Sequence, residues 1–515
     1  MIILTHDSKQ IVSCYKAGKA LAHYHQKPLV KTFFQVAQEF TNHLLIWVHQ
    51  DYQQALNYSA MDDIFHHKRI MASYALNQYL SKAIGYVEQG PFINVNHKVK
   101  YPTWRMHQDV GGVHTSVINA VKPHLNASKN LDYVLHSLAK LAQQQGLLCY
   151  SYPDLLKAEF PLKPVQKTKA SLSTLFRFIA QHYKWIWKHF MFLNLFIHEN
   201  KFPILGWLRH CLTKQIKPKD KLLEDVSLLE LRPFNNADIE LDVIIPTIGR
   251  KKYLYDVLKD LSKQSLLPKR IIIVEQNPDL NSVSELDYLQ TETWPFEINL
   301  EFTHQTGACK ARNMALDKVK SKWVFLADDD NRMSSNLIEN VFKHLETYKL
   351  DCITTVYIQK HEINSNKEVV QWPTFGAGNS FVNFKKIENL RFHKGLEHGY
   401  GEDVDFGMQI RNLGIDVIFS PQIIIDHLKA PIGGFRSKPL LAWRHENPLP
   451  KPSPTVLLSK LLHNTKEQVL GYKVLLFINT LKSKGYQHFF SHLHYFKKAW
   501  ATSEYWAKKL HNQNS

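Results

Sequence analysis

The stretch at residues 323–330, WVFLADDD, decides the fold of this chain. Five apolar residues are followed directly by three carboxylates, a pattern that predicts a buried strand ending in polar side chains. Open α/β sheets bind ligands at the carboxyl ends of their strands, and carboxylate oxygens suit Mg²⁺ or Mn²⁺. A cation would also relieve the repulsion between adjacent carboxylates near a core. The alternative interpretation is a solvated turn in which Asp330 and Asn331 cap a following helix.

Strand-like and helix-like segments alternate on both sides of this stretch. Apolar runs typical of strands cover residues 241–246, 270–275, 298–302 and 323–327, and helical periodicity covers residues 253–264 and 309–320. Strands that alternate with helices of about 10–15 residues indicate βαβ units and a parallel sheet. We therefore predict an α/β, Rossmann-like nucleotide-binding fold for this part of the chain.

Five short motifs occur in one order between residues 244 and 403. They are IIPT at 244–247, IIIVE at 271–275, GACKARN at 307–313, LADDD at 326–330 and GED at 401–403. In order and spacing they resemble family 2 glycosyltransferases, which have the Rossmann-like GT-A fold. The resemblance covers roughly residues 240–435. It implies a metal-dependent, inverting transfer of a sugar from a nucleoside-diphosphate sugar, expected to be UDP-linked, to a hydroxyl of a glycan or lipid-linked acceptor in bacterial surface polysaccharide synthesis.

The resemblance also implies which residues bind the donor. In that family the loop after the first strand and the acid after the second hold the base and ribose, and a later Gly-rich helix start approaches the diphosphate. The implied donor residues are Pro246, Thr247, Arg250, Glu275, Gly307, Lys310, Arg312, Asn313, Asp328 and Asp329. Glu275 stands where the family usually has Asp, and residues 276–278 (QNP) replace its small-residue turn. A solvated acid at a strand end is the alternative for Glu275.

The carboxylate triplet resembles the DxD motif of the family, which implies a Mn²⁺ or Mg²⁺ cofactor. Asp330 is then the expected direct metal ligand, and Asp328 contacts the ribose or the metal and its water. We expect Asp329 to point away, because neighbouring side chains of an extended segment alternate in direction. His427, which follows the apolar run at 423–425, is the expected third ligand, with a purely structural histidine as the alternative.

A second acidic motif lies at residues 399–411, GYGEDVDFGMQIR, where a helix is predicted to start at Glu402. The helix dipole stabilises ionised carboxylates at that end, and a general base near neutral pH must be ionised. By resemblance, Asp403 deprotonates the acceptor hydroxyl, while Glu402, Gly378 and Asn379 contact the acceptor. The alternative interpretation is that these acids only cap the helix.

The chain has 515 residues and a formal net charge of +18. Such a charge attracts polyanions, so a polyanion- or nucleic-acid-binding protein is one alternative function and an inactive GT-A-like scaffold is another. No RNP, KH, zinc-finger or helix-turn-helix pattern occurs, and we therefore expect no nucleic acid partner. The five cysteines form no CxxC, and the first ten residues lack a signal-peptide pattern, which indicates the cytoplasm.

The sequence predicts four regions. Residues 1–160 form a smaller α/β region whose role is open: a degenerate second glycosyltransferase-like module or an unrelated domain, with 49–51 (HQD) echoing residues 328–330. Residues 161–236 form a basic, aromatic, helical connector, residues 237–436 the catalytic domain, and residues 437–515 a Pro-rich linker and basic helical tail. The two basic helical regions either touch the cytoplasmic face of the inner membrane or pack on the protein.

Overall fold

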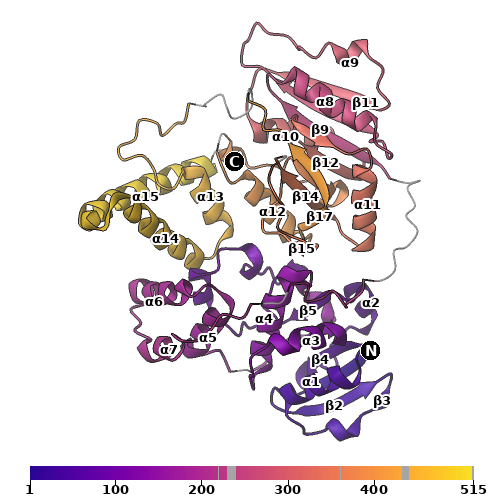
Figure 1. Cartoon of the computed structure of the whole chain (residues 1–515), viewed down its shortest axis with the longest axis vertical. Helices are drawn as coiled ribbons and strands as arrows, with labels where there is room; N and C mark the ends of the chain where they lie inside the picture. Colours follow the sequence, from indigo (N-terminus) through magenta and orange to yellow (C-terminus); the bar gives the residue numbers. More distant parts are fainter. Residues whose placement is uncertain are drawn as a thin grey trace. The chain divides into compact units, whose positions relative to one another are not determined.

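The computed structural model describes residues 1–166, 168–217, 220–228, 239–359, 361–397, 399–431 and 440–512. The chain divides into two compact units, Met1–Glu230 with Asn464–Leu475, and Leu231–His463 with Leu476–Ser515 (Figure 1). The first unit therefore consists of two separate stretches of sequence. The predicted boundaries at 236/237 and 436/437 lie outside the described residues.

The second unit is built on a mixed sheet with the strand order β11-β10-β9-β12-β16-β14-β17-β13, and β15 pairs with β17. Its strands are β9 (Leu241–Thr247), β10 (Arg270–Gln276), β11 (Glu297–Thr303), β12 (Trp323–Ala327), β13 (Asn331–Met333), β14 (Cys352–Ile358), β15 (Val370–Gln371), β16 (Asn379–Asn383) and β17 (Ile418–His427). Strands β11, β10, β9 and β12 are parallel, and β16 runs antiparallel between β12 and β14. All four strands predicted around the triplet are thus confirmed.

Helices cover both faces of this sheet. They are α8 (Lys251–Ser262), α10 (Ala308–Leu316), α11 (Leu337–Thr347) and α12 (Glu402–Asn412). Helices α8 and α11 share one core cluster with Val243 and Ile245 of β9, whereas α10 and α12 share the other with Ile244. This division follows from the alternation of side chains along a strand. Helix α10 ends at Leu316 rather than at residue 320 as predicted.

The first unit contains its own mixed sheet, with the order β3-β2-β1-β4-β7-β5-β8-β6. Its strands are β1 (Ile2–His6), β2 (Ile11–Lys16), β3 (Lys19–Ala20), β4 (Leu44–His49), β5 (Ile70–Tyr74), β6 (Tyr101–Pro102), β7 (Val110–His114) and β8 (Leu148–Ser151). Its helices are α1 (Leu29–Glu39), α2 (Met61–Ile64), α3 (Thr115–Val121), α4 (Leu131–Ala142), α5 (Leu172–His182), α6 (Ile186–Glu199) and α7 (Ile204–Arg209). The predicted α/β character of this region is confirmed. Helix α5 packs on α4, where the Tyr133 hydroxyl donates a hydrogen bond to the side chain of Gln181.

The C-terminal helices are α13 (Pro454–His463), α14 (Lys466–Lys484) and α15 (Phe489–Asn512). The beginning of α14 belongs to the first unit, where the Gln468 amide donates to the carbonyls of Glu88 and Gly90 at 3.0 Å. In the second unit, the Pro-rich stretch before α13 packs on α15, since Ser503 donates to the carbonyl of Pro452. In the described part of the chain, every helix is too short or too polar to cross a bilayer.

A buried ion pair ties β9 to its neighbours. Asp242 is fully buried and accepts hydrogen bonds from Arg270 and from the Ser321 hydroxyl. We expect Asp242→Ala to lower the free energy of unfolding by about 3–5 kcal/mol, because it leaves a buried guanidinium without this partner. Urea denaturation measures the loss. Glu297→Ala is the matched control, since this exposed carboxylate also pairs with Arg270, and it should cost less than about 1 kcal/mol. Equal effects of the two substitutions would contradict this account.

Candidate active site

The acidic triplet lies where β12 ends, in the middle of the sheet between β9 and β16. The residues that follow form β13, so the alternative interpretation of Asp330 and Asn331 as a helix cap is wrong. Asp329 points toward the loop after β9, where it accepts hydrogen bonds of 2.7 Å from the Thr247 hydroxyl and from Arg250. Burial raises the pKa of Asp329 to about 6, although Arg250 and Thr247 act in the opposite direction.

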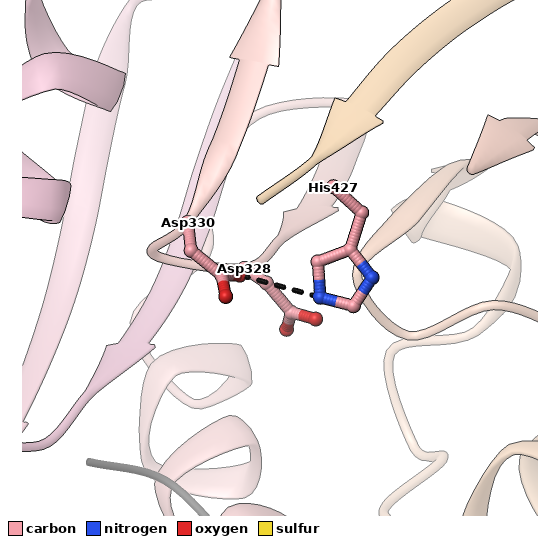
Figure 2. A group of neighbouring side chains, drawn as sticks. All are labelled: Asp328, Asp330 and His427. Atoms are coloured by element: carbon pink, nitrogen blue, oxygen red, sulfur yellow. Dashed lines mark ion pairs between the residues drawn. The ribbon is translucent and has the colours of Figure 1, made fainter. Parts of the chain in front are cut away.

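Asp328, Asp330 and His427 converge on one point, with one ligand atom from each within 4.8 Å of the others (Figure 2). The pairing of β13 with β17 brings His427 opposite Asn331, next to the triplet. The Nε2 atom of His427 lies 3.6 Å from Oδ1 of Asp330. That buried oxygen accepts no hydrogen bond within the described part of the chain, whereas the other oxygen of Asp330 accepts one from Ala430. Two carboxylates and an imidazole with an unused buried oxygen fit a divalent cation such as Mn²⁺ or Mg²⁺.

Tyr357 orients this cluster, although no sequence motif pointed to it. Its ring stacks on His427 with centroids 4.2 Å apart, and its hydroxyl donates to Asp328 at 3.0 Å. Tyr357 lies near the end of β14, which is remote in sequence from both partners. Only the pairing of β14 with β17 brings them together, so nothing in the local sequence could have identified it.

Arg312 connects the Asp328–Asp330–His427 cluster to the second acidic motif. Its guanidinium donates to Asp328 at 3.1 Å from the middle of α10. Burial acts to lower the pKa of Arg312, but the carboxylates of Asp328, Asp403 and Glu402 outweigh it and raise that pKa. The two acidic motifs are far apart in sequence, and both therefore interact with the buried guanidinium group of Arg312.

Glu402 and Asp403 form the first turn of α12, as predicted. Asp403 accepts a hydrogen bond of 3.3 Å from the backbone amide of Ala377. Burial, followed by the charge of Glu402, raises the pKa of Asp403 to about 7, and burial also raises the pKa of Glu402. A carboxylate of that basicity can accept a proton near neutral pH.

A cavity of about 390 Å³ opens beside Asp403. Its walls combine aromatic and small polar side chains, including Trp372, Phe375, Phe419, Thr354 and Asn379. Gly378, the residue before Asn379, lies against the Asp328–Asp330–His427 cluster. A Cβ atom at this position would lie 2.3 Å from an Asp328 oxygen. The amide of Asn379 donates to the carbonyl of Thr355, so this side chain holds the wall of the cavity in place.

Residues 242–400 match the model of a family described as "Glycosyl transferase family 2". This segment is a family 2 glycosyltransferase domain. With the mixed α/β sheet, the match confirms the predicted GT-A fold class, and it confirms the domain as that of a transferase.

Two curated relatives resemble the glycosyltransferase domain over part of their length. Glycosyltransferase GlyG of Streptococcus pneumoniae is 23% identical over 126 residues, which cover 24% of this chain and 42% of the relative. The uncharacterized glycosyltransferase YwdF of Bacillus subtilis is 32% identical over 109 residues, or 21% of this chain and 39% of the relative. The chain thus spans about two-fifths of the length of these relatives.

Two solved structures are also similar. S. aureus TarS in complex with UDP-GlcNAc has 15% identity and a TM-score of 0.35, covering 46% of this chain and 70% of that one. GalNAc-T7 with UDP, GalNAc and Mn²⁺ has 13% identity and a TM-score of 0.30, covering 40% of this chain and 48% of that one.

The remaining predicted donor residues of the glycosyltransferase domain lie along β9, β10 and α10. Pro246 and Thr247 end β9, and the Glu275 carboxylate at the end of β10 accepts from the amide of Glu285. Glu275 is buried, so its interpretation as a solvated acid is wrong. The amide of Asn313 is bound on both sides by the backbone of Phe392.

Glu397 is a site residue that the sequence analysis missed. Its carboxylate accepts hydrogen bonds from the amides of Cys309 and Lys310, at 3.0 and 2.9 Å, where α10 begins. Gly307 adopts φ 145° beside it, and a Cβ atom there would lie 2.5 Å from the Glu397 carboxyl carbon. The start of α10, the segment that was expected to approach the diphosphate, thus has two of its amides bound by a carboxylate of the chain itself. Glu397 lies outside the five motifs, so no pattern indicated this role.

The raised pKa of Asp403 predicts a pH-dependent effect of Asp403→Asn on stability. A carboxyl whose pKa rises from 3.8 to about 7 on folding is fully protonated in both states well below pH 3.8, and its ionisation costs the folded state increasingly as the pH rises toward 7. We therefore expect Asp403→Asn to gain stability relative to wild type between these pH values and to keep the gain above them. Thermal denaturation in EDTA measures it. Exposed Glu346→Gln should show no such trend, and a pH-independent difference for Asp403→Asn would contradict the assignment.

Proposed function

We propose that the chain is a metal-dependent, inverting glycosyltransferase that moves a sugar from a nucleoside-diphosphate sugar to a hydroxyl of a glycan or lipid-linked acceptor. The observation that carries the proposal is the position of Arg312 between the Asp328–Asp330–His427 cluster and the Glu402–Asp403 pair. A site for a cation that neutralises a diphosphate thereby adjoins a base with a pKa of about 7. The family match over residues 242–400 supports the reaction class.

Asp328, Asp330 and His427 would hold the cation, which supplies positive charge to the leaving diphosphate. Thr247, Arg250 and Glu275 border the same strand ends and would contact the nucleoside, for which we propose uridine. Arg250 already balances Asp329, and the pKa of Arg250 is raised by that carboxylate against the opposing effect of burial. Positively and negatively charged side chains of the site are therefore already paired before the donor binds.

The transfer would proceed by one displacement. Asp403 accepts the proton of the acceptor hydroxyl as that oxygen forms a bond to the anomeric carbon. The bond from this carbon to the diphosphate oxygen breaks at the same time, and the nucleoside diphosphate leaves. Attack opposite to the leaving group inverts the configuration, and no covalent intermediate with the protein forms. The acceptor would lie in the cavity beside Asp403, whose wall includes Asn379. Glu402 and Gly378, each next in sequence to a lining residue, would contact the acceptor from the edge of the cavity.

Asp330→Ala and Asp403→Asn separate donor binding from transfer. We expect Asp330→Ala to lose Mn²⁺-dependent binding of the donor, because it removes the buried ligand oxygens of the cluster. Asp403→Asn should bind donor normally and lower the transfer rate by about 10²–10⁴-fold, as expected when a general base is lost. A screen of nucleotide sugars, with nucleoside diphosphate release and donor binding as readouts, tests both. Exposed Glu346→Gln is the control, and transfer by Asp403→Asn at the wild-type rate would refute the role of Asp403.

We also propose that α6 and α7 dock the protein on an anionic membrane surface. Large apolar side chains are exposed there, with Trp185 69%, Leu205 85% and Leu212 94% exposed. Basic residues occupy the same stretch, namely Lys184, Lys201, Arg209, Lys214 and Lys217. Exposed apolar side chains flanked by cations are typical of helices that lie in the headgroup region of a bilayer. Such contact suits a lipid-linked acceptor and an enzyme on the cytoplasmic face.

Co-sedimentation with vesicles of phosphatidylglycerol and phosphatidylcholine tests this docking. We expect the double substitution Leu205→Glu and Leu212→Glu to reduce binding by about fivefold or more, because it places carboxylates in the apolar contact. Leu280→Glu is the matched control, since Leu280 is 79% exposed in the second unit, and it should bind like wild type. Equal losses in both variants, or no binding by the wild type, would exclude the proposed surface.

A further inference from the structure

The first unit repeats the strand connectivity of the transferase sheet. In the second unit, β9, β12, β16, β14 and β17 lie side by side with orientations parallel, antiparallel, antiparallel and parallel between neighbours. In the first unit, β1, β4, β7, β5 and β8 lie side by side with the same four orientations. The chain visits the five strands in the same order in both units. A shared order, neighbour set and direction for five strands is a specific likeness of topology.

The registers of the two sheets also correspond. Val110, the first residue of β7, pairs with Val48, and Asn379, the first residue of β16, pairs with Ala327. When Val48 is matched to Ala327 on this basis, residues 49–51 (HQD) occupy the place of residues 328–330 (DDD). The resemblance of these two stretches thus has a structural counterpart. One carboxylate of the three remains in the first unit.

The position of the proposed base has a counterpart as well. Asp132 is the second residue of α4, as Asp403 is the second residue of α12, and each helix leads into the last of the five strands. The amide of Gln108 donates to Oδ1 of Asp132 at 3.0 Å, and the amide of Ala377 donates to Oδ1 of Asp403 at 3.3 Å. Both donors stand two residues before the first residue of the antiparallel strand. The same carboxylate–amide contact is therefore present in both sheets.

The surroundings of the two carboxylates differ. Of residues 372–378, which precede β16, Trp372, Thr374, Phe375 and Gly376 line the cavity of about 390 Å³ beside Asp403. The corresponding residues 103–109 are all buried. His107 lies 3.8 Å from Asp132, which is 0% exposed, and the ring of Trp104 meets that of His136 in α4 edge to face, with centroids 5.9 Å apart. The chain itself thus fills the place that is open in the second unit.

The strand ends of the first unit are filled in the same way. His6, at the end of β1, is fully buried and shares a hydrogen bond with the carbonyl of Gln108. Its ring meets that of His49 edge to face, with centroids 5.6 Å apart. Among the described residues, only the second unit brings three potential metal-ligand side chains together. A donor diphosphate and its cation would find neither room nor ligands at this edge.

We infer that residues 1–151 are a second copy of the transferase core whose site has been closed by residues 103–109, so that Asp132 is a structural group and the chain binds one donor, in the second unit. The inference rests on the proposed function only for the identity of the donor. The closed copy contributes a rigid core on which α5, α6 and α7 are carried.

Equilibrium binding of UDP with Mn²⁺ to the full chain tests the number of sites. We expect one UDP per chain in the wild type, none in Asp330→Ala, and one in Asp132→Asn with an affinity within about threefold of wild type. Two UDP per chain would overturn the inference. A site that survives Asp330→Ala and disappears in Asp132→Asn would overturn it as well.

Thermal denaturation supplies a readout that does not depend on donor binding. As a buried group that accepts from the backbone, Asp132 should be needed for stability, and Asp132→Asn should lower Tm by about 5 °C. Exposed Asp62→Asn is the control and should leave Tm unchanged. If no UDP binds to any protein but Asp132→Asn still lowers Tm, the proposed function fails while the closed copy stands. An unchanged Tm for Asp132→Asn would show that the carboxylate is not a structural group and would refute the inference.

Discussion

The rest of the site depends on the grouping of four carboxylates where β12 ends in the sheet of the second unit. Asp328, Asp330, Glu402 and Asp403 all lie there, and such proximity is unfavourable unless positive charge compensates it. Arg312 provides the fixed part of that charge. Burial acts to lower its pKa, but Asp328, Asp403 and Glu402 outweigh this effect and raise it. The remaining excess of negative charge favours a cation, and burial together with the charge of Glu402 raises the pKa of Asp403. The proposed metal binding and the proposed proton transfer would therefore both depend on one electrostatic arrangement.

The order of strands and helices in the second unit could be predicted because each is a local pattern: apolar runs such as residues 270–275 are buried on both sides wherever they lie. The acidic motifs could also be predicted, because each is a local pattern of consecutive residues. Tyr357 and Glu397 could not, since their partners come from other elements and only the folded sheet brings them together. Helix α10 ends early, at Leu316, because the backbone turns there: the amides of Lys318 and Val319 donate to carbonyls three residues back instead of four.

The first unit shows why topology carries information that sequence motifs lose. The HQD stretch at 49–51 was a weak signal, because one carboxylate and one imidazole are common at strand ends. The register of β4 and β7 places this stretch at the position that residues 328–330 occupy in the second unit. Packing has replaced electrostatics there: imidazole and indole rings fill the region where the second unit gathers charges. A framework of this kind tolerates the exchange, since its strands are held by backbone hydrogen bonds and apolar cores.

The discontinuity of the first unit has a consequence for how the chain folds. Gln468 returns after more than 200 intervening residues to bind the carbonyls of Glu88 and Gly90. During synthesis the N-terminal sheet emerges first, yet this contact must wait until α14 has left the ribosome. The first unit therefore stays incomplete until the beginning of α14 has been made, and a face near Tyr86 is left uncovered until then. A fragment that ends at residue 230 would keep that face exposed permanently, and we therefore expect that a cut at this boundary would not produce two independently folded proteins.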